Sequence, residues 1–447
     1  MASTNDRQGH AQAAPTGAGS AADGTGGDGG LVRITLPVWW TFGGLVAGLV
    51  LGGLVQGSGI EDAAASVAAP VGTLWLRGLQ MTIIPLVASL LVMGIAQMIA
   101  AARAGATARR MLGWVFVMLV FSGLASAVFM PLLLDAFPIP EAATALLANG
   151  AAMEAQEVPG LGDFVSSLVA PNLFAAAAET AMLPLTLFFA VLAIAITRLP
   201  DGQGEVLLRF FRALGNAMLV IIGWVLWLAP LGVFALAFGV ALRAGGDGAF
   251  ATLIHYILTV SAMGGIVLLA AYGLAVTIGR IGPVRFARAV LPAQAVAIST
   301  QSSLASLPAM LDSARRLRLR EDTADFVLPL AVAIFRATSP AMNMAVAIYV
   351  ATLVGIELTP LTLATGIAVA FIISVGSVSL PGSISFVISI GPIALAMGVP
   401  IEPLALLVAV EMLPDIMRTL ANVTMNVAVT AATDRGAGET GVSEQEN

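Results

Sequence analysis

Residues 280–320 read RIGPVRFARAVLPAQAVAISTQSSLASLPAMLDSARRLRLR, and this stretch decides how the chain is threaded. It consists of an apolar block, 289–311, with a cluster of arginines on each side and a polar centre at 299–308 (STQSSLASLP). Arginines gather in the cytoplasmic loops of membrane proteins, so a block that crossed the bilayer would leave one cluster on the wrong side. A block that enters and returns keeps both clusters inside, and its polar centre suits irregular backbone that lines a cavity. We therefore predict a re-entrant helical hairpin; a polar spanning helix is the alternative, and it leaves the arginines unexplained.

The rest of the chain shares this apolar character. Of its 447 residues, 58% are hydrophobic and 10% are charged, whereas about a quarter of the residues of a soluble domain are charged. Apolar stretches long enough to cross a bilayer as helices, about 20 residues each, recur along most of the sequence. The composition therefore predicts an all-α polytopic membrane protein and excludes a single soluble core.

Several chemistries are excluded by the residues that the sequence lacks. It has no cysteine, and all 20 of its basic residues are arginines, so disulfides and lysine Schiff bases are ruled out. It contains no phosphate loop, no His/Cys metal cluster and no nucleophile motif, so we expect no enzymatic activity. Its arginines follow the loops rather than one face, so we expect the lipid bilayer, and no nucleic acid, as its surroundings.

A second block, 361–398, repeats the hairpin pattern. It is too long for one crossing and is broken by a polar centre at 376–383 (GSVSLPGS). The resulting order is helix, hairpin, helix, hairpin, helix, with the two hairpins entering from opposite sides of the membrane. Inverted repeats whose broken segments meet near the midplane are typical of secondary transporters.

The two ends differ from the rest in composition. Residues 1–30 are rich in Gly, Ala, Ser, Thr and Asp and hold almost no large apolar side chain, so they cannot repay the entropy of ordering. Residues 433–447 are polar and acidic. We expect two disordered tails, and the arginine pattern places both termini in the cytoplasm, with the protein in the cytoplasmic (inner) membrane.

The last apolar block, 400–432, carries the candidate binding site. Polar residues recur there at helical spacing and so share one face; they are Glu411, Asp415, Arg418, Thr419, Asn422 and Asn426. A charge at bilayer depth costs about 2.5–3.5 kcal/mol on insertion scales, so this face needs a cavity that holds water or ligand. An Asp415–Arg418 ion pair that only holds helices together is the alternative.

The chemistry of this face suits an acidic zwitterion. The planar guanidinium of Arg418 matches a carboxylate, and the carboxylate of Asp415, one helical turn away, matches an ammonium group. Serine hydroxyls and backbone N–H groups at the hairpin tips could bind a second carboxylate.

These segments resemble a known family. Residues 415–424 (DIMRTLANVT) look like the last helix of the glutamate/aspartate transporter family, the dicarboxylate/amino acid:cation symporters, and 300–308 resemble the serine-rich first hairpin of that family. Further matching motifs follow in order, at 84–86 (IPL), 183–189 (LPLTLFF), 229–234 (APLGVF), 328–330 (LPL) and 380–382 (LPG). The resemblance covers about 30–432.

The resemblance implies an architecture that composition alone does not. We expect eight transmembrane helices plus two re-entrant hairpins, built as inverted repeats, in a homotrimeric elevator-type transporter. Scaffold helices 1–2 would lie within 31–108 and scaffold helices 4–5 within 164–245. The transport domain would comprise helix 3 at 109–136 and, within 246–432, helix 6, hairpin 1, helix 7, hairpin 2 and helix 8.

The resemblance also assigns roles to residues. Arg418 would bind the side-chain carboxylate of the substrate, Asp415 its amino group, and Ser303 with Ser339 its main carboxylate. The expected substrate-binding residues are Ser302, Ser303, Ser339, Leu380, Pro381, Gly382, Asp415, Arg418, Thr419 and Asn422.

The sequence departs from the family where the family builds sodium sites. The Asn-Met-Asp-Gly-Thr motif of helix 7 is replaced by 335–339 (FRATS), and Asn426 stands where helix 8 carries a sodium-binding Asp. Hard cations need several oxygen ligands, usually with a carboxylate, so we expect no metal at these positions. Arg336, in an otherwise apolar helix, would supply the missing positive charge and pair with Asp415, Glu411 or substrate; a structural pair with Glu411 is the alternative.

The sequence therefore predicts a secondary active transporter of aspartate or glutamate that works without sodium. Glu411 and Asp415 are candidate proton carriers, so coupling to protons stays open. Two other functions also stay open: a sodium- or proton-coupled symporter of C4-dicarboxylates or neutral amino acids, and a sensor that binds substrate without moving it. Asp415 argues against a substrate that lacks an amino group, and Arg418 argues against a neutral one.

Overall fold

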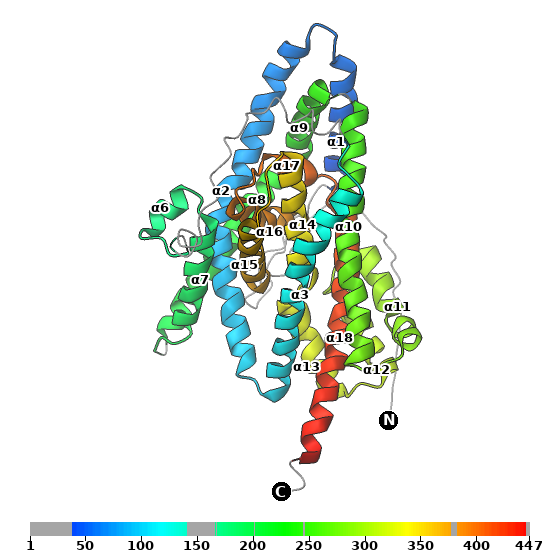
Figure 1. The fold of residues 1–447 in the computed structure, drawn as a ribbon. Helices are drawn as coiled ribbons and strands as arrows, with labels where there is room; N and C mark the ends of the chain where they lie inside the picture. The colour runs from blue at the N-terminus through cyan, green and yellow to red at the C-terminus, as the bar shows by residue number, and fades with distance from the viewer. Residues whose placement is uncertain are drawn as a thin grey trace, which may run out of the picture. The chain divides into compact units, whose positions relative to one another are not determined.

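The computed structural model describes residues 38–140, 166, 168–200, 202–244, 246–376 and 382–443. One compact unit spans Val32–Asn447, and the tail expected at 1–30 lies outside the described residues. Within these ranges every regular element is a helix (Figure 1). In chain order the helices are α1 (Val38–Val55), α2 (Glu61–Ala102), α3 (Ala106–Ala136), α6 (Leu173–Ala178), α7 (Met182–Ile196), α8 (Gln203–Trp227), α9 (Ala229–Ala244), α10 (Gly246–Thr277), α11 (Pro283–Thr300), α12 (Leu307–Leu317), α13 (Glu321–Ile334), α14 (Thr338–Leu353), α15 (Pro360–Gly376), α16 (Gly382–Ala396), α17 (Glu402–Leu407) and α18 (Met412–Ser443).

Several of these helices suit a lipid environment. Five helical segments in the described ranges are long and apolar enough to span a membrane, namely Glu61–Ala102, Ala106–Ala136, Gln203–Trp227, Phe250–Thr277 and Glu321–Leu353. Large apolar side chains also project outward, since Trp224 is 67% exposed and Leu269 is 72% exposed. Exposing such an apolar surface to water is unfavourable, whereas lipid solvates it. The all-α membrane fold expected from the composition is confirmed.

The first predicted hairpin is present as the pair α11 and α12. These helices pack against each other and against α18 (Figure 1). α11 ends where Gln301 adopts a left-handed backbone with φ 50°, and Pro308 lies in the first turn of α12. The two arginine clusters that predicted the hairpin meet at one pocket, which Arg285 and Arg320 both line. The block therefore returns to the side from which it started.

The second block forms two packed helices as well, α15 and α16. The stretch 377–381 between them, with the predicted tip residues Leu380 and Pro381, lies outside the described residues. Between the two pairs the chain is interrupted once more, because α13 ends at Ile334 and α14 begins at Thr338. Arg336 was expected inside a continuous apolar helix, and it lies instead in this break.

The last helix is longer than predicted. The polar tail expected at 433–447 starts as part of α18, which continues to Ser443. Thr433 is buried, and Asp434 accepts hydrogen bonds from Arg320, at 2.8 Å to its carboxylate and 3.1 Å to its carbonyl oxygen. The composition of this segment indicated a tail, but packing and the ion pair with the start of α13 keep its first residues ordered. α3 likewise begins at Ala106, slightly before the predicted start at 109.

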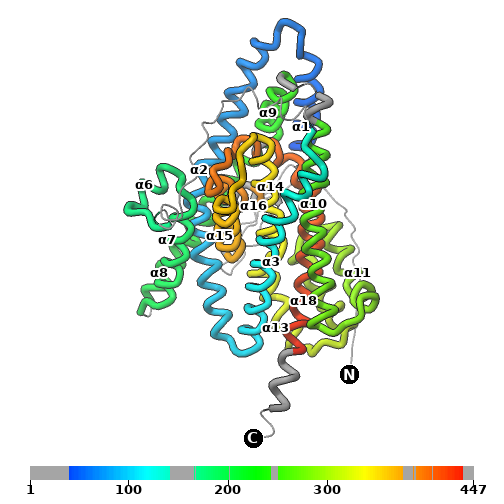
Figure 2. Tube along the Cα trace, viewed as in Figure 1, coloured from blue at the N-terminus to red at the C-terminus, as the bar shows by residue number. Residues whose placement is uncertain are grey.

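α18 lies inside a group of helices, and this position buries its polar face. It contacts α3, α10, α11, α12, α13, α14 and α16. α10 and α18 run side by side along much of their length (Figure 2). A polar stripe on a helix enclosed in this way has no lipid or bulk water to face, so its side chains must find partners on the neighbouring helices.

α1 packs on α9 through a stripe of glycines. Gly44, Gly48 and Gly52 recur every four residues and so share one helical face. A Cβ atom at Gly48 would lie 2.5 Å from the carbonyl oxygen of Phe234, and one at Gly52 would lie 2.6 Å from that of Phe238. Helices approach this closely in membranes where small residues leave room for the facing backbone. The α1–α9 contact therefore depends on the absence of side chains at these positions.

We predict that Gly48→Ala destabilises the protein, whereas Gly43→Ala does not. A Cβ at Gly43 meets nothing within 4 Å, so alanine there should raise stability slightly, by up to about 1 kcal/mol of helix propensity. At Gly48 the added methyl overlaps backbone that cannot move aside, and overpacking costs roughly 1–3 kcal/mol. Thermal unfolding of both purified variants in detergent measures the difference. Equal melting temperatures for the two variants would contradict the close α1–α9 contact.

Candidate functional site

The site is built on the first turns of α18. Pro414 lies in the first turn of this helix, where its missing N–H leaves no hydrogen bond unmade. Asp415 also lies in the first turn, where the helix dipole favours a negative charge. Glu411 directly precedes the helix. All three residues thus lie at the start of α18, where α10 and α14 also contribute side chains.

Arg418 is the centre of the buried polar contacts. Its guanidinium donates to Glu411 Oε1 at 2.6 Å and to Asn343 Oδ1 at 2.7 Å, and its Nε lies 3.3 Å from Asp415 Oδ1. Arg418 is 7% exposed and Glu411 1%. Breaking such a buried pair by removing one partner leaves an uncompensated charge and costs about 3–5 kcal/mol. We call Arg418, Glu411, Asp415 and Asn343 the Arg418 cluster.

Side chains from α10 and α14 complete the Arg418 cluster. Tyr256 of α10 donates its hydroxyl to Glu411 Oε2 at 3.1 Å, so both oxygens of that carboxylate have partners. On α14, Asn343 donates to Ser339 Oγ at 2.9 Å. A continuous chain of hydrogen bonds therefore runs from Tyr256 through Glu411, Arg418 and Asn343 to Ser339. The predicted residues Asp415, Arg418, Glu411 and Ser339 are brought together by this arrangement.

The break between α13 and α14 lies against the same face of α18. Asn422 accepts a hydrogen bond from the backbone N–H of Thr338 at 3.0 Å, so a side chain of one helix caps the start of another. Ser122 of α3 also binds backbone at this break: it donates to the carbonyl oxygen of Ala337 at 2.5 Å and accepts from the N–H of Ala341 at 3.0 Å. These bonds satisfy backbone groups that an interrupted helix leaves free inside the bundle.

Arg336 lies in this break with one guanidinium nitrogen unpartnered. Its Nε is buried and has no hydrogen-bond partner among the described residues. Asp415 attracts its charge and Arg418 repels it. The alternative in which Arg336 serves as a structural partner of Glu411 stays a prediction: the described residues show no ion pair between the two, and Arg418 and Tyr256 each contact one oxygen of the Glu411 carboxylate.

Asn426, one turn beyond Asn422, is buried with an incomplete environment. Neither its amide nitrogen nor its amide oxygen has a hydrogen-bond partner in the described part of the chain. The hydroxyl of Thr338 at the start of α14 and that of Ser126 on α3 are buried without partners as well. Buried polar atoms without partners are unusual and call for an explanation, such as a bound water or ligand.

Other predicted site residues are not drawn into the Arg418 cluster by any described contact. The hydroxyl of Ser302 accepts from the N–H of Ala305 at 3.2 Å, which keeps it within the hairpin tip, and Ser303 is half-buried. Thr419 is buried on the polar face. Leu380 and Pro381 lie outside the described residues, and Gly382 begins α16.

Three contributors were absent from the predicted site. Tyr256, Asn343 and Ser122 sit in apolar helices at positions that local patterns do not distinguish. A usable signal existed for Asn343 and Ser339, which are four residues apart and therefore share a helical face. Tyr256 and Ser122 carry no such signal, because only the packing of α10 and α3 on α14 and α18 gives them a role.

Comparison with known proteins agrees with this architecture. Residues 38–435 match the family model described as the sodium:dicarboxylate symporter family. The proton/sodium-glutamate symport protein of Bacillus subtilis (strain 168) is 27% identical over 390 residues, which is 86% of this chain and 89% of that protein. Neutral amino acid transporter A of Homo sapiens is 27% identical over 490 residues, covering 95% of this chain and 87% of that protein.

The match spans nearly every described helix, from α1 to the buried part of α18. It includes both helical pairs and the Arg418 cluster. The buried charges thus lie within the segment that the family shares, and the amino acid carriers among its relatives extend over the same length. The chain belongs to the sodium:dicarboxylate symporter family and is a multi-pass membrane transporter rather than an enzyme.

Proposed function

We propose that this transporter carries acidic amino acids, aspartate or glutamate, and does so without sodium. The observation that carries the proposal is the buried guanidinium of Arg418, held 3.3 Å from Asp415 and 2.6 Å from Glu411. A guanidinium binds a carboxylate through parallel hydrogen bonds, and Asp415 supplies the opposite charge that an ammonium group needs. The side-chain carboxylate and the ammonium group of an acidic amino acid therefore have complementary partners one helical turn apart.

Substrate would bind by replacing partners that Arg418 holds now. An entering side-chain carboxylate takes the place of Glu411 Oε1 or Asn343 Oδ1, and the amino group takes Asp415. In the proposal Ser303 and Ser339 meet the main carboxylate, while Thr419 and Asn422 add hydrogen bonds. Exchange of one carboxylate for another at the same guanidinium keeps the charge of Arg418 compensated throughout, which a buried site requires.

The charge count around Arg418 supports independence from sodium. Two guanidiniums, those of Arg418 and Arg336, face two carboxylates, those of Glu411 and Asp415, so the group is formally neutral without any metal ion. A sodium ion beside Asp415 would have to share that carboxylate with Arg418 and would be repelled by Arg336. A neutral group that receives an acidic amino acid gains one negative charge, and protonation of Glu411 or Asp415 would restore neutrality.

The donor set at the family's sodium positions also fits sodium poorly. Sodium, like other hard cations, needs several oxygen ligands and usually a carboxylate, whereas the side chains at 335–339 and of Asn426 offer two hydroxyls and one amide oxygen but no carboxylate. The unpartnered Nε of Arg336 lies in the same break and brings a positive charge instead.

A neutral amino acid is the second candidate substrate. The 2.6 Å contact between Arg418 and Glu411 favours it, because a pair that stays intact during transport leaves no free guanidinium for a side-chain carboxylate. Neutral amino acid transporter A of Homo sapiens, a protein named for a neutral substrate, is similar to this chain. The two candidates differ in one requirement: the acidic substrate needs Arg418 to exchange partners, and the neutral substrate does not.

We propose a homotrimer in the cytoplasmic membrane with both termini in the cytoplasm. In each protomer, α3, α10 and the helices from α11 to α18 move substrate as one body. The arginine-rich ends of α11 and α12 suit a cytoplasmic side. A sensor that only binds substrate is excluded if preloaded vesicles show counterflow of labelled aspartate.

We predict that labelled aspartate enters proteoliposomes equally well when choline replaces sodium, and that Arg336→Met reduces this uptake at least tenfold. Methionine keeps the length of the side chain but removes the charge that balances Asp415. Arg316→Met is the matched control, because Arg316 is exposed and its ion pair is with Asp312, four residues away on the same helix. Uptake that disappears without sodium would refute sodium independence, and uptake that survives Arg336→Met would refute the role of its charge.

We predict that Arg418→Gln weakens aspartate binding by about 100-fold, or about 2.8 kcal/mol, while binding of neutral amino acids changes little. The double variant Arg418→Gln/Glu411→Gln is the control for folding, since it leaves neither member of the pair with an uncompensated charge. Ligand-induced thermal shifts of each purified variant give the affinities. If both variants keep the affinity of the wild type for aspartate, the acidic side chain binds elsewhere and the proposed substrate is wrong.

A further inference from the structure

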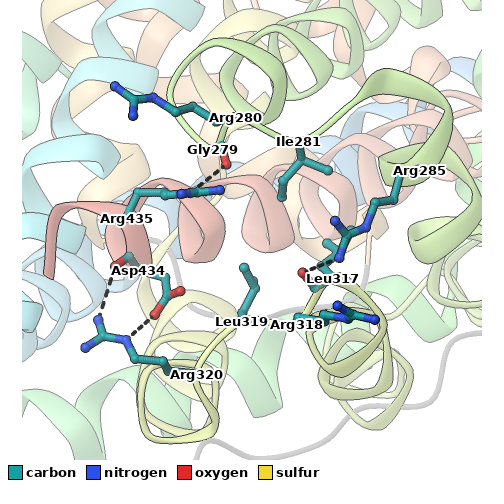
Figure 3. A pocket seen from close by; sticks show the side chains of 10 residues that line it. All are labelled: Gly279, Arg280, Ile281, Arg285, Leu317, Arg318, Leu319, Arg320, Asp434 and Arg435. Carbon is teal, nitrogen blue, oxygen red and sulfur yellow. Dashed lines mark hydrogen bonds and ion pairs between the residues drawn. The ribbon is translucent and has the colours of Figure 1, made fainter. Parts of the chain in front are cut away.

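A second group of charged residues lies at the open end of the first hairpin, opposite its tip. A pocket of about 480 Å³ is bordered there by the connection after α10, by the ends of α11 and α12 and by the last turns of α18 (Figure 3). Its charged lining residues are Arg280, Arg285, Arg318, Arg320, Asp434 and Arg435. Five positive charges against one negative charge leave a formal net charge of +4 in the lining.

Most of these arginines are oriented without being neutralised. Arg285 and Arg435 each donate to a backbone carbonyl oxygen, at 3.0 Å and 3.3 Å. Arg320 pairs with Asp434 at 2.8 Å, which occupies the one acidic side chain of the lining. A carbonyl oxygen accepts a hydrogen bond but carries no formal charge. The guanidiniums of Arg285 and Arg435 are therefore held in position by these hydrogen bonds, and their positive charge is not neutralised.

Arg280 and Arg318 stand out among the lining residues. The side chain of neither residue makes a hydrogen bond or ion pair with another residue that the structure describes, and Figure 3 draws no dashed line to either. Both have left-handed backbones, with φ 51° at Arg280 and φ 60° at Arg318. Glycine is the ordinary residue for such a backbone after a helix. Backbone preference therefore does not explain why arginine occurs at these two positions.

We propose that this pocket binds a phosphate-bearing anion. Planar guanidiniums bind phosphate oxygens through paired hydrogen bonds, and five arginines line this one cavity. A topological role explains why arginines occur in these loops, but not why four segments bring them to one pocket with only one acid. A phosphate bound here would join the hairpin, the start of α13 and the C-terminal part of α18, the helix that carries Arg418.

Two sources of such a phosphate fit the chemistry, an anionic phospholipid headgroup and a soluble phosphate compound. The experiment measures thermal unfolding of the full-length protein in neutral detergent at constant ionic strength. One arm adds phosphatidylglycerol in mixed micelles, with phosphatidylcholine as the reference. The other arm adds inorganic pyrophosphate, with sodium chloride as the reference. Stabilisation by phosphatidylglycerol identifies a lipid headgroup, and stabilisation by pyrophosphate identifies a soluble ligand.

The test variant is Arg280→Gly/Arg318→Gly, and the control is Arg315→Gln/Arg316→Gln. Glycine suits both backbones, so the test variant should unfold near the wild-type temperature when no probe is present. The control removes the same charge from arginines that pair with Glu321 and Asp312 outside the lining. We expect the test variant to lose at least tenfold in apparent affinity for the stabilising probe and the control to keep it.

The proposal is overturned if neither probe raises the unfolding temperature of the wild type above its reference. It is also overturned if Arg315→Gln/Arg316→Gln weakens the response as much as Arg280→Gly/Arg318→Gly, because net charge rather than this pocket would then explain binding. Neither outcome bears on the substrate of the Arg418 cluster, since the two groups share no residue.

Discussion

The rest of the structure depends on the requirement that the buried guanidinium of Arg418 be fully partnered. A charge removed from water inside a protein costs several kcal/mol unless opposite charges and hydrogen bonds surround it. Here the partners come from three helices: Glu411 and Asp415 at the start of α18, Asn343 on α14 and, through Glu411, Tyr256 on α10. A shift of any of these helices would leave a charge exposed to an apolar interior. The packing of α10, α14 and α18 is therefore as much electrostatic as hydrophobic.

A similar requirement for partners applies to the backbone at the interruption between α13 and α14. An intact helix would satisfy its own backbone and present Arg336 to its neighbours like any other side chain. The break frees backbone groups, and Asn422 and Ser122 then bind them from α18 and α3. Polar side chains that look excessive on a membrane helix thus have a structural task, which is to make irregular backbone stable inside the bundle. The break in turn places Arg336 where Asp415 and Arg418 both act on its charge.

Sequence reasoning succeeded where the deciding information is local. The hairpin of α11 and α12 follows from arginine placement and a polar centre, and the polar face of α18 follows from spacing, because both signals lie within one segment. It failed where distant segments decide. Tyr256 and Glu411 are 155 positions apart, and Asn343 and Arg418 are 75 apart, so no periodic pattern links them. The end of α18 was missed for the same reason, since Arg320 secures Asp434 from 114 positions away.

The replacement of a cation by a side chain has a thermodynamic consequence. A bound ion that travels with substrate transfers the free energy of its own gradient, because it is released on the far side. A guanidinium attached to the chain neutralises the same charge but never leaves, so it does no work on the substrate. If Arg336 acts as proposed, accumulation of an acidic amino acid must draw on another gradient, either protons that bind Glu411 or Asp415 or a second amino acid moving in exchange. The arginine thus replaces the bound cation in charge balance, and coupling to a gradient must then involve the two carboxylates or the exchanged amino acid.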